Sequence, residues 1–336
     1  MNKTLSRIRL TVFGAVMVGV VSFPAGAAAQ VYTMPPNLKP LPAWNLSLVA
    51  NGGTSTLRFS TTSWNSGTGP LQLEPGAVLT GGDKQQINQR IFNSDGTSVL
   101  HMNAGWFTYH AGHNHIHFDD YALYTLQPVN APGGSSRTGQ KTTFCIMDTT
   151  AVNTSLPGAP GAAVYNTCTT QIQGMSVGWG DTYGSHLVGQ EIDFTNNADG
   201  IYQLKIEVDP KTLLVESNKS DNVSCVLVDI RMPSTVTVLD SSGSCSTVTS
   251  VTPDSATVGT WVQVTITGYG FTPGMTITFE GGNGPRPVAS NVQFVSANVV
   301  TATVTIPNKK QPAKDPVWDV RVGAGGLLRN AFTVTR

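Results

Sequence analysis

The stretch "GIYQLKIEV" (Gly200–Val208) decides the fold class, because its side chains alternate in character. Every second position is apolar and the positions between are mainly polar: Tyr202, Leu204, Ile206 and Val208 against Ile201, Gln203, Lys205 and Glu207. Residues two apart lie on the same face of a β-strand. The stretch therefore predicts a strand with one buried face and one face toward solvent.

Similar short runs recur along the chain, whereas helical periodicity is nearly absent. Val, Thr, Ile, Phe and Tyr dominate these runs, and Gly, Pro, Asn, Asp and Ser clusters separate them: "STLRFSTTSWN" (55–65), "HIHFDDYALYTL" (115–126), "KTTFCIMDTT" (141–150), "EIDFT" (191–195) and "SCVLVDIRM" (224–232). Such runs with turn residues between them are typical of β proteins. The sequence predicts an all-β, β-sandwich-like body.

The residue pattern changes after the Ser/Thr-rich stretch "MPSTVTVLDSSGSCSTVTS" (232–250). Apolar residues then alternate at Val262, Val264 and Ile266 and again at Met275, Ile277 and Phe279. Further strands are expected at 299–307, 317–322 and 330–336. Short strands of this spacing predict a second, smaller β-sandwich over residues 248–336.

The first 29 residues have the pattern of a secretory signal peptide. Lys3, Arg7 and Arg9 precede the apolar run "LTVFGAVMVGVVSF", and "AGAAAQ" offers a cleavage site, with Ala29 expected as the last residue removed. The alternative is an uncleaved anchor, but the run is shorter than the roughly 18 residues of a spanning helix. We expect a secreted or periplasmic/extracellular protein with no membrane span after cleavage.

The net charge limits the classes of binding partner, and the cysteine content predicts disulfides. Removing residues 1–29 leaves 17 basic against 20 acidic side chains, a net charge of −3, which gives no electrostatic case for nucleic acid or anionic lipid. An exported chain with four cysteines is expected to form two disulfides. Local pairing favours Cys145–Cys168 and Cys225–Cys245, although sequence alone leaves three connectivities open. No Cys-x-x-Cys spacing indicates structural zinc.

Four of the six histidines fall within eight residues, "HAGHNHIH" (110–117). His113, His115 and His117 alternate, so one strand face would present three imidazoles. An ideal strand spreads the first and third about 13 Å apart, so one ion requires a bend, for which Gly112 is a plausible place. Three imidazoles suit copper, zinc or non-haem iron, and affinity favours copper.

Two further interpretations concern the surroundings of these histidines. His110 and Asp119 or Asp120 would act as hydrogen-bonding partners of the ligands, or the two aspartates form a solvated turn. A cupin also carries His-x-His, but only His186 lies further along this chain, and no matching second motif supplies a fourth ligand.

Other motifs occur in a fixed order around the histidines. They are "STLRFSTTSWNSGTGPLQL", "HNHIHFDDYALYTL", "GQKTTFCIMDT", "GMSVGWGDTYGSHLVGQEIDFT" and "GIYQLKIEVDPKTLLVESNKSDN". Together, from about Pro42 to Ile230, they resemble the lysyl oxidase catalytic domain in the form found in secreted bacterial proteins. The predicted domain covers residues 30–240.

This resemblance implies a copper-dependent amine oxidase. The copper ligands would be His113, His115 and His117, and Lys141 would cross-link with Tyr183 into the self-derived cofactor lysine tyrosylquinone. Primary amines or peptidyl lysine would be oxidised by dioxygen to aldehydes, with release of hydrogen peroxide and ammonia. Burial near a metal would keep the lysine amine neutral, as its addition to an oxidised ring requires.

The C-terminal pattern "P…GT.V.ITG.GF..G…..F", then "V.IP" and a terminal "FTV", resembles the IPT/TIG immunoglobulin-like module of cell-surface and secreted proteins, over Val248–Arg336. This resemblance implies an adhesion or spacer role, with a surface or polymer as partner.

The chain departs from the lysyl oxidase pattern in several places. Gly112 stands where animal enzymes have a disulfide cysteine, and Leu123 stands where a histidine is invoked in catalysis. The identity of the general base is therefore not determined by the resemblance. Four other residues are candidates for this role: Asp119, Asp120, Asp181 and His186. Acidic features that attract lysine-rich matrix proteins are not evident, so collagen or elastin is not assumed as substrate.

Without the resemblance, simpler interpretations apply to the same residues. Lys141 would be a solvated charge at a strand edge, and Tyr183 an ordinary half-buried aromatic residue. The alternative function is a non-catalytic copper-binding extracytoplasmic or cell-surface protein that uses the same three histidines.

Overall fold

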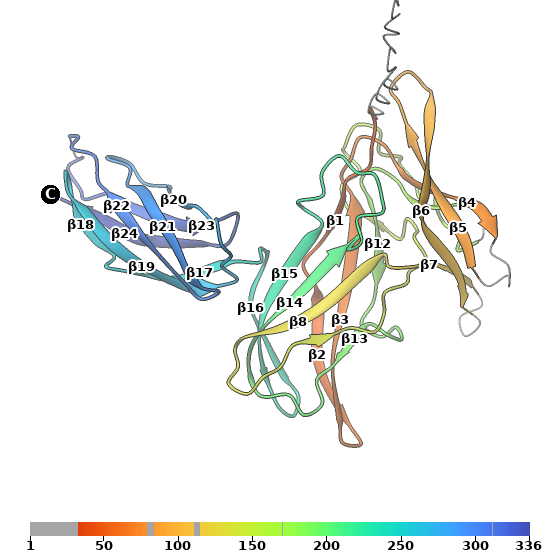
Figure 1. Ribbon diagram of the computed structural model, residues 1–336, viewed down its shortest axis with the longest axis horizontal. Helices are drawn as coiled ribbons and strands as arrows, with labels where there is room; N and C mark the ends of the chain where they lie inside the picture. The colour runs from red at the N-terminus through yellow and green to blue at the C-terminus, as the bar shows by residue number, and fades with distance from the viewer. Residues whose placement is uncertain (1–32, 79–83, 111–114, 170, 311) are drawn as a thin grey trace, which may run out of the picture. The chain divides into compact units, whose positions relative to one another are not determined.

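The computed structural model describes residues 33–78, 84–110, 115–169, 171–310 and 312–336. Within these ranges every regular element is a strand and none is a helix, which confirms the all-β prediction (Figure 1). The described part of the chain contains no helix long and apolar enough to cross a membrane. The predicted signal peptide, residues 1–29, lies outside the described residues.

One sheet is organised around the long strand β3. Its strands run in the order β1-β3-β12-β10, with β2 and β13 also paired to β3: β1 (Leu38–Pro40), β2 (Trp44–Asn51), β3 (Thr54–Asn65), β10 (Thr150–Ala151), β12 (Trp179–Tyr183) and β13 (Glu191–Asp193). The antiparallel register pairs Thr61 with Tyr183 and Ser63 with Asp181. This pairing fixes the position of the "DTY" motif.

A second sheet carries the histidine strand. Its order is β11-β4-β5-β6-β7, with β4 (Leu71–Val78), β5 (Lys84–Phe92), β6 (Ser98–His110), β7 (His115–Phe118) and β11 (Gln173–Met175). Strand β7 is the last strand of this path, and its neighbour in the path is β6, with His117 opposite Thr108. A sheet edge leaves the other side of β7 available to a segment outside the sheet.

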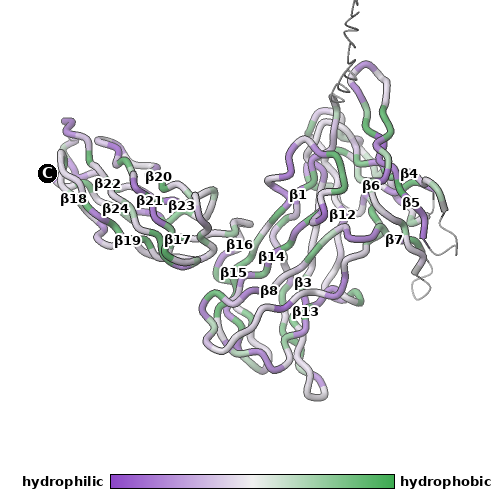
Figure 2. The backbone as a smooth tube through the Cα atoms, in the orientation of Figure 1, coloured by the Kyte–Doolittle hydropathy of each residue, from purple (hydrophilic) through white to green (hydrophobic). Residues whose placement is uncertain are grey.

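The third sheet contains the stretch that predicted the fold. Its order is β16-β15-β14-β8-β9, with β8 (Ala122–Asn130), β9 (Arg137–Thr138), β14 (Gly200–Val208), β15 (Val223–Arg231) and β16 (Thr235–Gly243). Along β14 the apolar positions are buried and the alternate positions are partly exposed, as predicted. Figure 2 shows hydrophobic and hydrophilic patches interspersed along the strands of the molecule.

The three sheets contribute to one buried apolar cluster. Aromatic side chains connect its parts, because Phe144 contacts Tyr121, Tyr124 and Tyr183, with ring centroids 5.7, 6.0 and 4.9 Å apart. Edge-to-face contacts of this kind add stabilisation beyond the buried area. The core therefore extends directly to the tyrosine of the predicted cofactor.

Both predicted disulfides are confirmed. Cys145–Cys168 has an S–S distance of 2.02 Å, and Cys225–Cys245 one of 2.08 Å. Their Cα atoms lie 5.5 and 4.9 Å apart, within the usual range for disulfides.

The C-terminal strands form two four-stranded sheets. One has the order β17-β19-β22-β21 and the other β18-β24-β23-β20: β17 (Thr247–Thr252), β18 (Ser255–Thr257), β19 (Trp261–Tyr269), β20 (Ile277–Glu280), β21 (Val288–Ser296), β22 (Val299–Thr305), β23 (Val317–Val322) and β24 (Leu327–Thr335). Val264, Ile266, Ile277 and Phe279 belong to a second buried cluster, separate from the first. The predicted strands are present; the assignment to the IPT/TIG family remains a prediction.

Substitutions at two neighbouring residues of β14 test the alternation of buried and partly exposed side chains along this strand. Leu204 is fully buried, so Leu204→Ala should lower the free energy of unfolding by about 2–5 kcal/mol through lost burial and a cavity. Lys205 faces the other side and pairs with Glu207, so Lys205→Ala should cost less than about 1 kcal/mol. Equilibrium unfolding in urea measures both, and equal losses would contradict the assigned faces.

Candidate functional site

The site begins at the edge strand β7. His117 is 2% exposed, and its Nδ1 lies 3.1 Å from Oγ1 of Thr143. Of His115 the structure describes the backbone, which belongs to β7 as predicted, and His113 lies outside the described residues. Among the side chains that are described, no three His, Cys, Asp or Glu residues gather as a metal site.

A backbone pairing joins the histidine strand to the segment that carries Lys141. Phe118 N–H donates to the Phe144 carbonyl at 2.6 Å, and Phe144 N–H donates to the Phe118 carbonyl at 3.0 Å. The buried amide of Gln173 adds a second connection, donating to the Ile116 carbonyl and accepting from Ile146 N–H, each at 3.0 Å. These bonds satisfy the free edge of β7 and bring His117 next to residues 141–146.

Lys141 and Tyr183, 42 positions apart in the chain, face one another. The Nζ of Lys141 lies 5.0 Å from the centroid of the Tyr183 ring and 4.9 Å from that of Phe144. Burial lowers the pKa of Lys141, and the negative charge of Asp181 opposes this effect. Lys141 is thus partly buried over two aromatic rings, which differs from a solvated charge at a strand edge.

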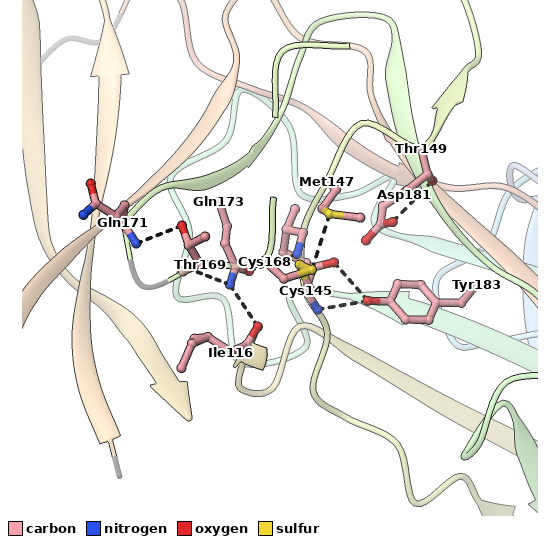
Figure 3. The surroundings of a disulfide bond; sticks show 11 residues. Ile116, Cys145, Met147, Thr149, Cys168, Thr169, Gln171, Gln173, Asp181 and Tyr183 are labelled. Atoms are coloured by element: carbon pink, nitrogen blue, oxygen red, sulfur yellow. Dashed lines mark hydrogen bonds between the residues drawn. A yellow bond between two sulfur atoms is a disulfide. The ribbon is translucent and has the colours of Figure 1, made fainter. Parts of the chain in front are cut away.

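The Tyr183 hydroxyl is held by the backbone of Cys145. It accepts from the Cys145 N–H and donates to the Cys145 carbonyl, both at 2.9 Å (Figure 3). Burial and the nearby Asp181 raise the pKa of Tyr183 well above its ordinary value. Since Cys145 is cross-linked to Cys168, the disulfide anchors the segment that orients this ring.

A cavity of about 380 Å³ connects these groups. The described residues that line it are His117, Lys141, Cys145, Met147, Thr149, Cys168, Asp181, Thr182, Tyr183, Leu187 and Val188. Among the candidate site residues whose side chains are described, His117, Lys141 and Tyr183 therefore share one cavity. Its walls are mainly apolar, as expected for a small-molecule site with a few polar groups.

The loop after β12 contributes Leu187 and Val188 to this cavity. Arg58 holds the loop, because its Nε donates to the Ser185 carbonyl at 2.7 Å and its Nη2 to the Leu187 carbonyl at 2.9 Å. Val188 is 77% exposed, which places an apolar side chain at the solvent end of the lining. The loop therefore forms a fixed apolar rim.

Asp181 supplies the cavity with a buried carboxyl group. It is 3% exposed, its Oδ1 lies 3.4 Å from the Thr149 hydroxyl, and its Oδ2 has no hydrogen-bond partner among the described residues (Figure 3). Burial raises the pKa of Asp181 well above its ordinary value. An unpartnered buried oxygen is costly, so such a group in a cavity is a candidate for function.

The other candidate bases lie elsewhere. Asp119 pairs with Lys84 at 3.0 Å, Asp120 pairs with Lys211 at 2.7 Å, and neither is among the described residues that line the cavity. His186 is exposed and is also absent from the lining. Leu123 alternates with the buried Ala122 and Tyr124 on β8, so its side chain lies on the opposite face from the Tyr124 ring.

Sequence reasoning missed the residues that assemble the site. Thr143, Phe144 and the backbone of Cys145 contact His117, Lys141 and Tyr183 respectively. Their only sequence signal was their place inside the motif "KTTFC" directly after Lys141.

Comparison with known proteins points to one enzyme family. Residues 85–238 match the family model described as Lysyl oxidase. Protein-lysine 6-oxidase of Homo sapiens is 33% identical over 145 residues, which is 43% of this chain and 32% of that protein. Lysyl oxidase homolog 1 of Homo sapiens is 34% identical over 116 residues, which is 34% of this chain and 19% of that protein.

This chain is homologous to lysyl oxidases. Protein-lysine 6-oxidase of Gallus gallus is likewise 32% identical over 145 residues, or 43% of this chain and 32% of that protein. The chain thus spans about a third or less of the length of these relatives. The lysyl oxidase region, residues 85–238, includes every described residue of the cavity.

Among solved structures, the S-layer protein SbsC domains 4 and 5 match 79% of this chain and 98% of that chain, with 10% identity. The TM-score of 0.18 supports no structural conclusion.

Replacing the buried aspartates Asp148 and Asp181 by asparagine should change the free energy of unfolding in opposite directions. Asp148 accepts hydrogen bonds from Val164, Tyr165 and Ser176, so Asp148→Asn should lower the free energy of unfolding by about 2–4 kcal/mol. Because burial raises the folded-state pKa of Asp181 above its unfolded value, the native state binds the proton more tightly and loses stability as pH rises through that folded pKa.

Asp181→Asn removes this titration, so the variant should gain stability relative to wild type as pH rises. Urea unfolding at pH 5 and pH 8 measures both variants. If Asp181→Asn lowered the free energy of unfolding at pH 8 as much as Asp148→Asn does, the two aspartates would not differ in their contribution to stability, and the prediction would be wrong.

Proposed function

We propose that the protein is a secreted copper-dependent amine oxidase of the protein-lysine 6-oxidase type. It would convert primary amines or peptidyl lysine to aldehydes with dioxygen and water, releasing hydrogen peroxide and ammonia. The observation that carries the proposal is the placement of the Lys141 amine 5.0 Å from the Tyr183 ring centroid, in the cavity that His117 also lines.

The donor chemistry of the predicted metal site suits copper. We propose His113, His115 and His117 as the ligands. The contact of His117 Nδ1 with Thr143 supports Nε2 of that ring as the proposed metal-binding atom. His117 is buried, so a bound ion would be shielded from solvent on that side.

Lys141 and Tyr183 are the proposed precursors of lysine tyrosylquinone. Burial favours the neutral, nucleophilic amine of Lys141, and the Cys145 backbone fixes the direction of the Tyr183 C–O bond. When bound, copper supplies one-electron redox chemistry with dioxygen, and the cross-linked quinone supplies an electrophilic electron acceptor. The residues of this chain supply the position and the protonation state of the two precursors.

The apolar walls of the cavity support an amine with an apolar chain as substrate. Met147, Leu187 and Val188 would contact the methylene groups of such a chain, and the amine would reach the Lys141–Tyr183 pair. Both peptidyl lysine and small alkyl amines have this form. The domain limits 30–240 and 248–336 remain part of the proposal.

The region 248–336 is proposed as an IPT/TIG-like spacer or adhesion module for a surface or polymer partner. Its buried cluster is separate from that of the lysyl oxidase region, and it contributes no described residue to the cavity. With the proposed signal peptide at 1–29, this organisation suits a secreted, periplasmic or extracellular protein.

Peptide mass mapping after aerobic copper loading tests the proposed function. The peptides that carry Lys141 and Tyr183 should appear as one cross-linked species, and amines should release peroxide. Lys141→Arg and Tyr183→Phe should each abolish the cross-link and peroxide release, because each removes one precursor, whereas Lys205→Arg on the partly exposed face of β14 should leave both intact. Copper chelation before loading should have the same effect as the two variants.

The non-catalytic alternative gives a different result. Copper uptake with separate, unmodified peptides, insensitive to Lys141→Arg and Tyr183→Phe, would favour a copper-binding protein.

The contact between His117 and Thr143 yields a separate prediction about the metal. Thr143→Val removes the hydroxyl partner of Nδ1 and should weaken copper binding about 10–100-fold, the usual effect of losing such a partner. Competition with a chromophoric chelator measures the affinity. Thr142→Val, on the same segment, is the matched control, and an equal loss in both variants would contradict a specific role of Thr143.

A further inference from the structure

The carboxyl group of Asp181 differs from the other buried aspartates among the described residues. Asp148 and Asp209 have both oxygens bonded: Asp148 to three backbone N–H groups and a hydroxyl, and Asp209 to Leu213, Leu214 and Lys219. Oδ2 of Asp181 is buried without a partner. Buried aspartates with a structural role usually have both oxygens hydrogen-bonded, whereas Asp181, on strand β12, has only Oδ1 bonded.

The strand places Asp181 beside the proposed cofactor. Asp181 and Tyr183 are two apart on β12, so their side chains leave the same face of the strand, and both line the main cavity. The contact of Oδ1 with Thr149 holds the carboxyl plane from one side. Oδ2 is therefore the oxygen left to receive a proton.

Asp181 also borders a second, inner cavity of about 10 Å³, close to the room that one water molecule requires. Its described lining includes Tyr121 and Tyr124, whose hydroxyls contact Ser63 at 2.7 Å and Thr61 at 2.9 Å. These hydroxyls offer a polar environment behind the carboxyl group. A proton taken up from the main cavity would therefore reach a polar, enclosed site.

No other carboxyl group occurs among the described residues that line the main cavity. The remaining titratable residues there have other proposed roles: His117 as ligand, and Lys141 and Tyr183 as cofactor precursors. The cysteines are joined in a disulfide. The titratable groups that act on the charge of Asp181 are Asp148 and Lys141, and the Thr149 hydroxyl donates to its Oδ1.

We propose that Asp181 is the general base that takes the proton from the α-carbon of the amine substrate. This inference rests on the proposed amine oxidase function. In the step, the substrate nitrogen is bonded to the quinone formed from Lys141 and Tyr183, the α C–H bond breaks, and the proton moves to Oδ2 of the ionised carboxylate. The electron pair of that bond forms a C=N bond to the substrate nitrogen and reduces the ring by two electrons. Water then releases the aldehyde, and the nitrogen leaves as ammonia. Dioxygen then reoxidises the cofactor and yields hydrogen peroxide.

The test uses the full chain after aerobic copper loading, with wild type, Asp181→Asn, Asp181→Glu and His186→Asn compared. Peptide mass and titration with phenylhydrazine measure the cofactor, independently of turnover. Peroxide release from butylamine and from its α-dideuterated form measures catalysis. His186→Asn is the matched control, because His186 was a candidate base from sequence but is exposed and does not line the cavity.

In Asp181→Asn we expect the cross-link and phenylhydrazine uptake of wild type, and a fall in kcat/KM of about 100-fold or more. The deuterium isotope effect on kcat/KM should increase, because proton abstraction becomes fully rate-limiting. His186→Asn should stay within about threefold of wild type. Asp181→Glu should recover part of the activity, with the acidic limb of its pH profile displaced.

Cross-linked Asp181→Asn with kcat/KM within threefold of wild type would overturn the assignment. If Asp181→Asn fails to fold or to form the cofactor, Asp181→Glu decides the question, and a pH profile identical to wild type would count against Asp181. Absence of cross-link and peroxide in wild type would instead refute the proposed function itself.

Discussion

The site depends on one backbone pairing, the two hydrogen bonds between Phe118 and Phe144. They join the edge strand β7 to the irregular segment that follows Lys141. The neighbours of the paired residues make the decisive contacts, because His117 precedes Phe118 and bonds Thr143, and Cys145 follows Phe144 and holds Tyr183. The Phe144 ring then packs against Tyr183 and lies beneath the Lys141 amine. A short pairing therefore fixes the positions of His117 on one side of the cavity and of Lys141 and Tyr183 on the other.

Burial sets the protonation states in this cavity. Removal from water is the largest cause of the pKa shift in both Lys141 and Asp181, lowering the first and raising the second. The attraction between the two opposite charges opposes both shifts but is the smaller effect. Both groups thus move toward their neutral forms, as expected for a lysine and a carboxyl group in a mainly apolar cavity. A neutral amine is the form that can bond to an oxidised ring, so the burial of Lys141, which lowers stability, favours the form that the proposed cofactor requires.

Local patterns in the sequence predicted the fold well and the site in part. Alternation in Gly200–Val208 gave the buried face of β14, and proximity in the chain gave both disulfides, because each depends on short-range geometry. The faces of Leu123 and Asp181 were not predictable in the same way. The first depends on the register of β8, and the second on the pairing of β12 with β3, which joins positions about 120 residues apart. The sequence named Asp181 among four candidates, and only the fold distinguishes it from Asp119, Asp120 and His186.

The same geometry bears on the choice between the proposed oxidase and a protein that would only bind copper. Imidazoles on a strand suffice for binding, and nothing in that role requires a lysine to be partly buried over a tyrosine ring, or a carboxyl oxygen to be buried without a partner. Both features are unfavourable for stability. They occur together, next to His117, in a cavity whose rim is held by Arg58. Proteins tolerate such cost mainly where function requires it. Because the unfavourable groups are the ones that amine oxidation needs, the arrangement favours a catalytic role over metal binding alone.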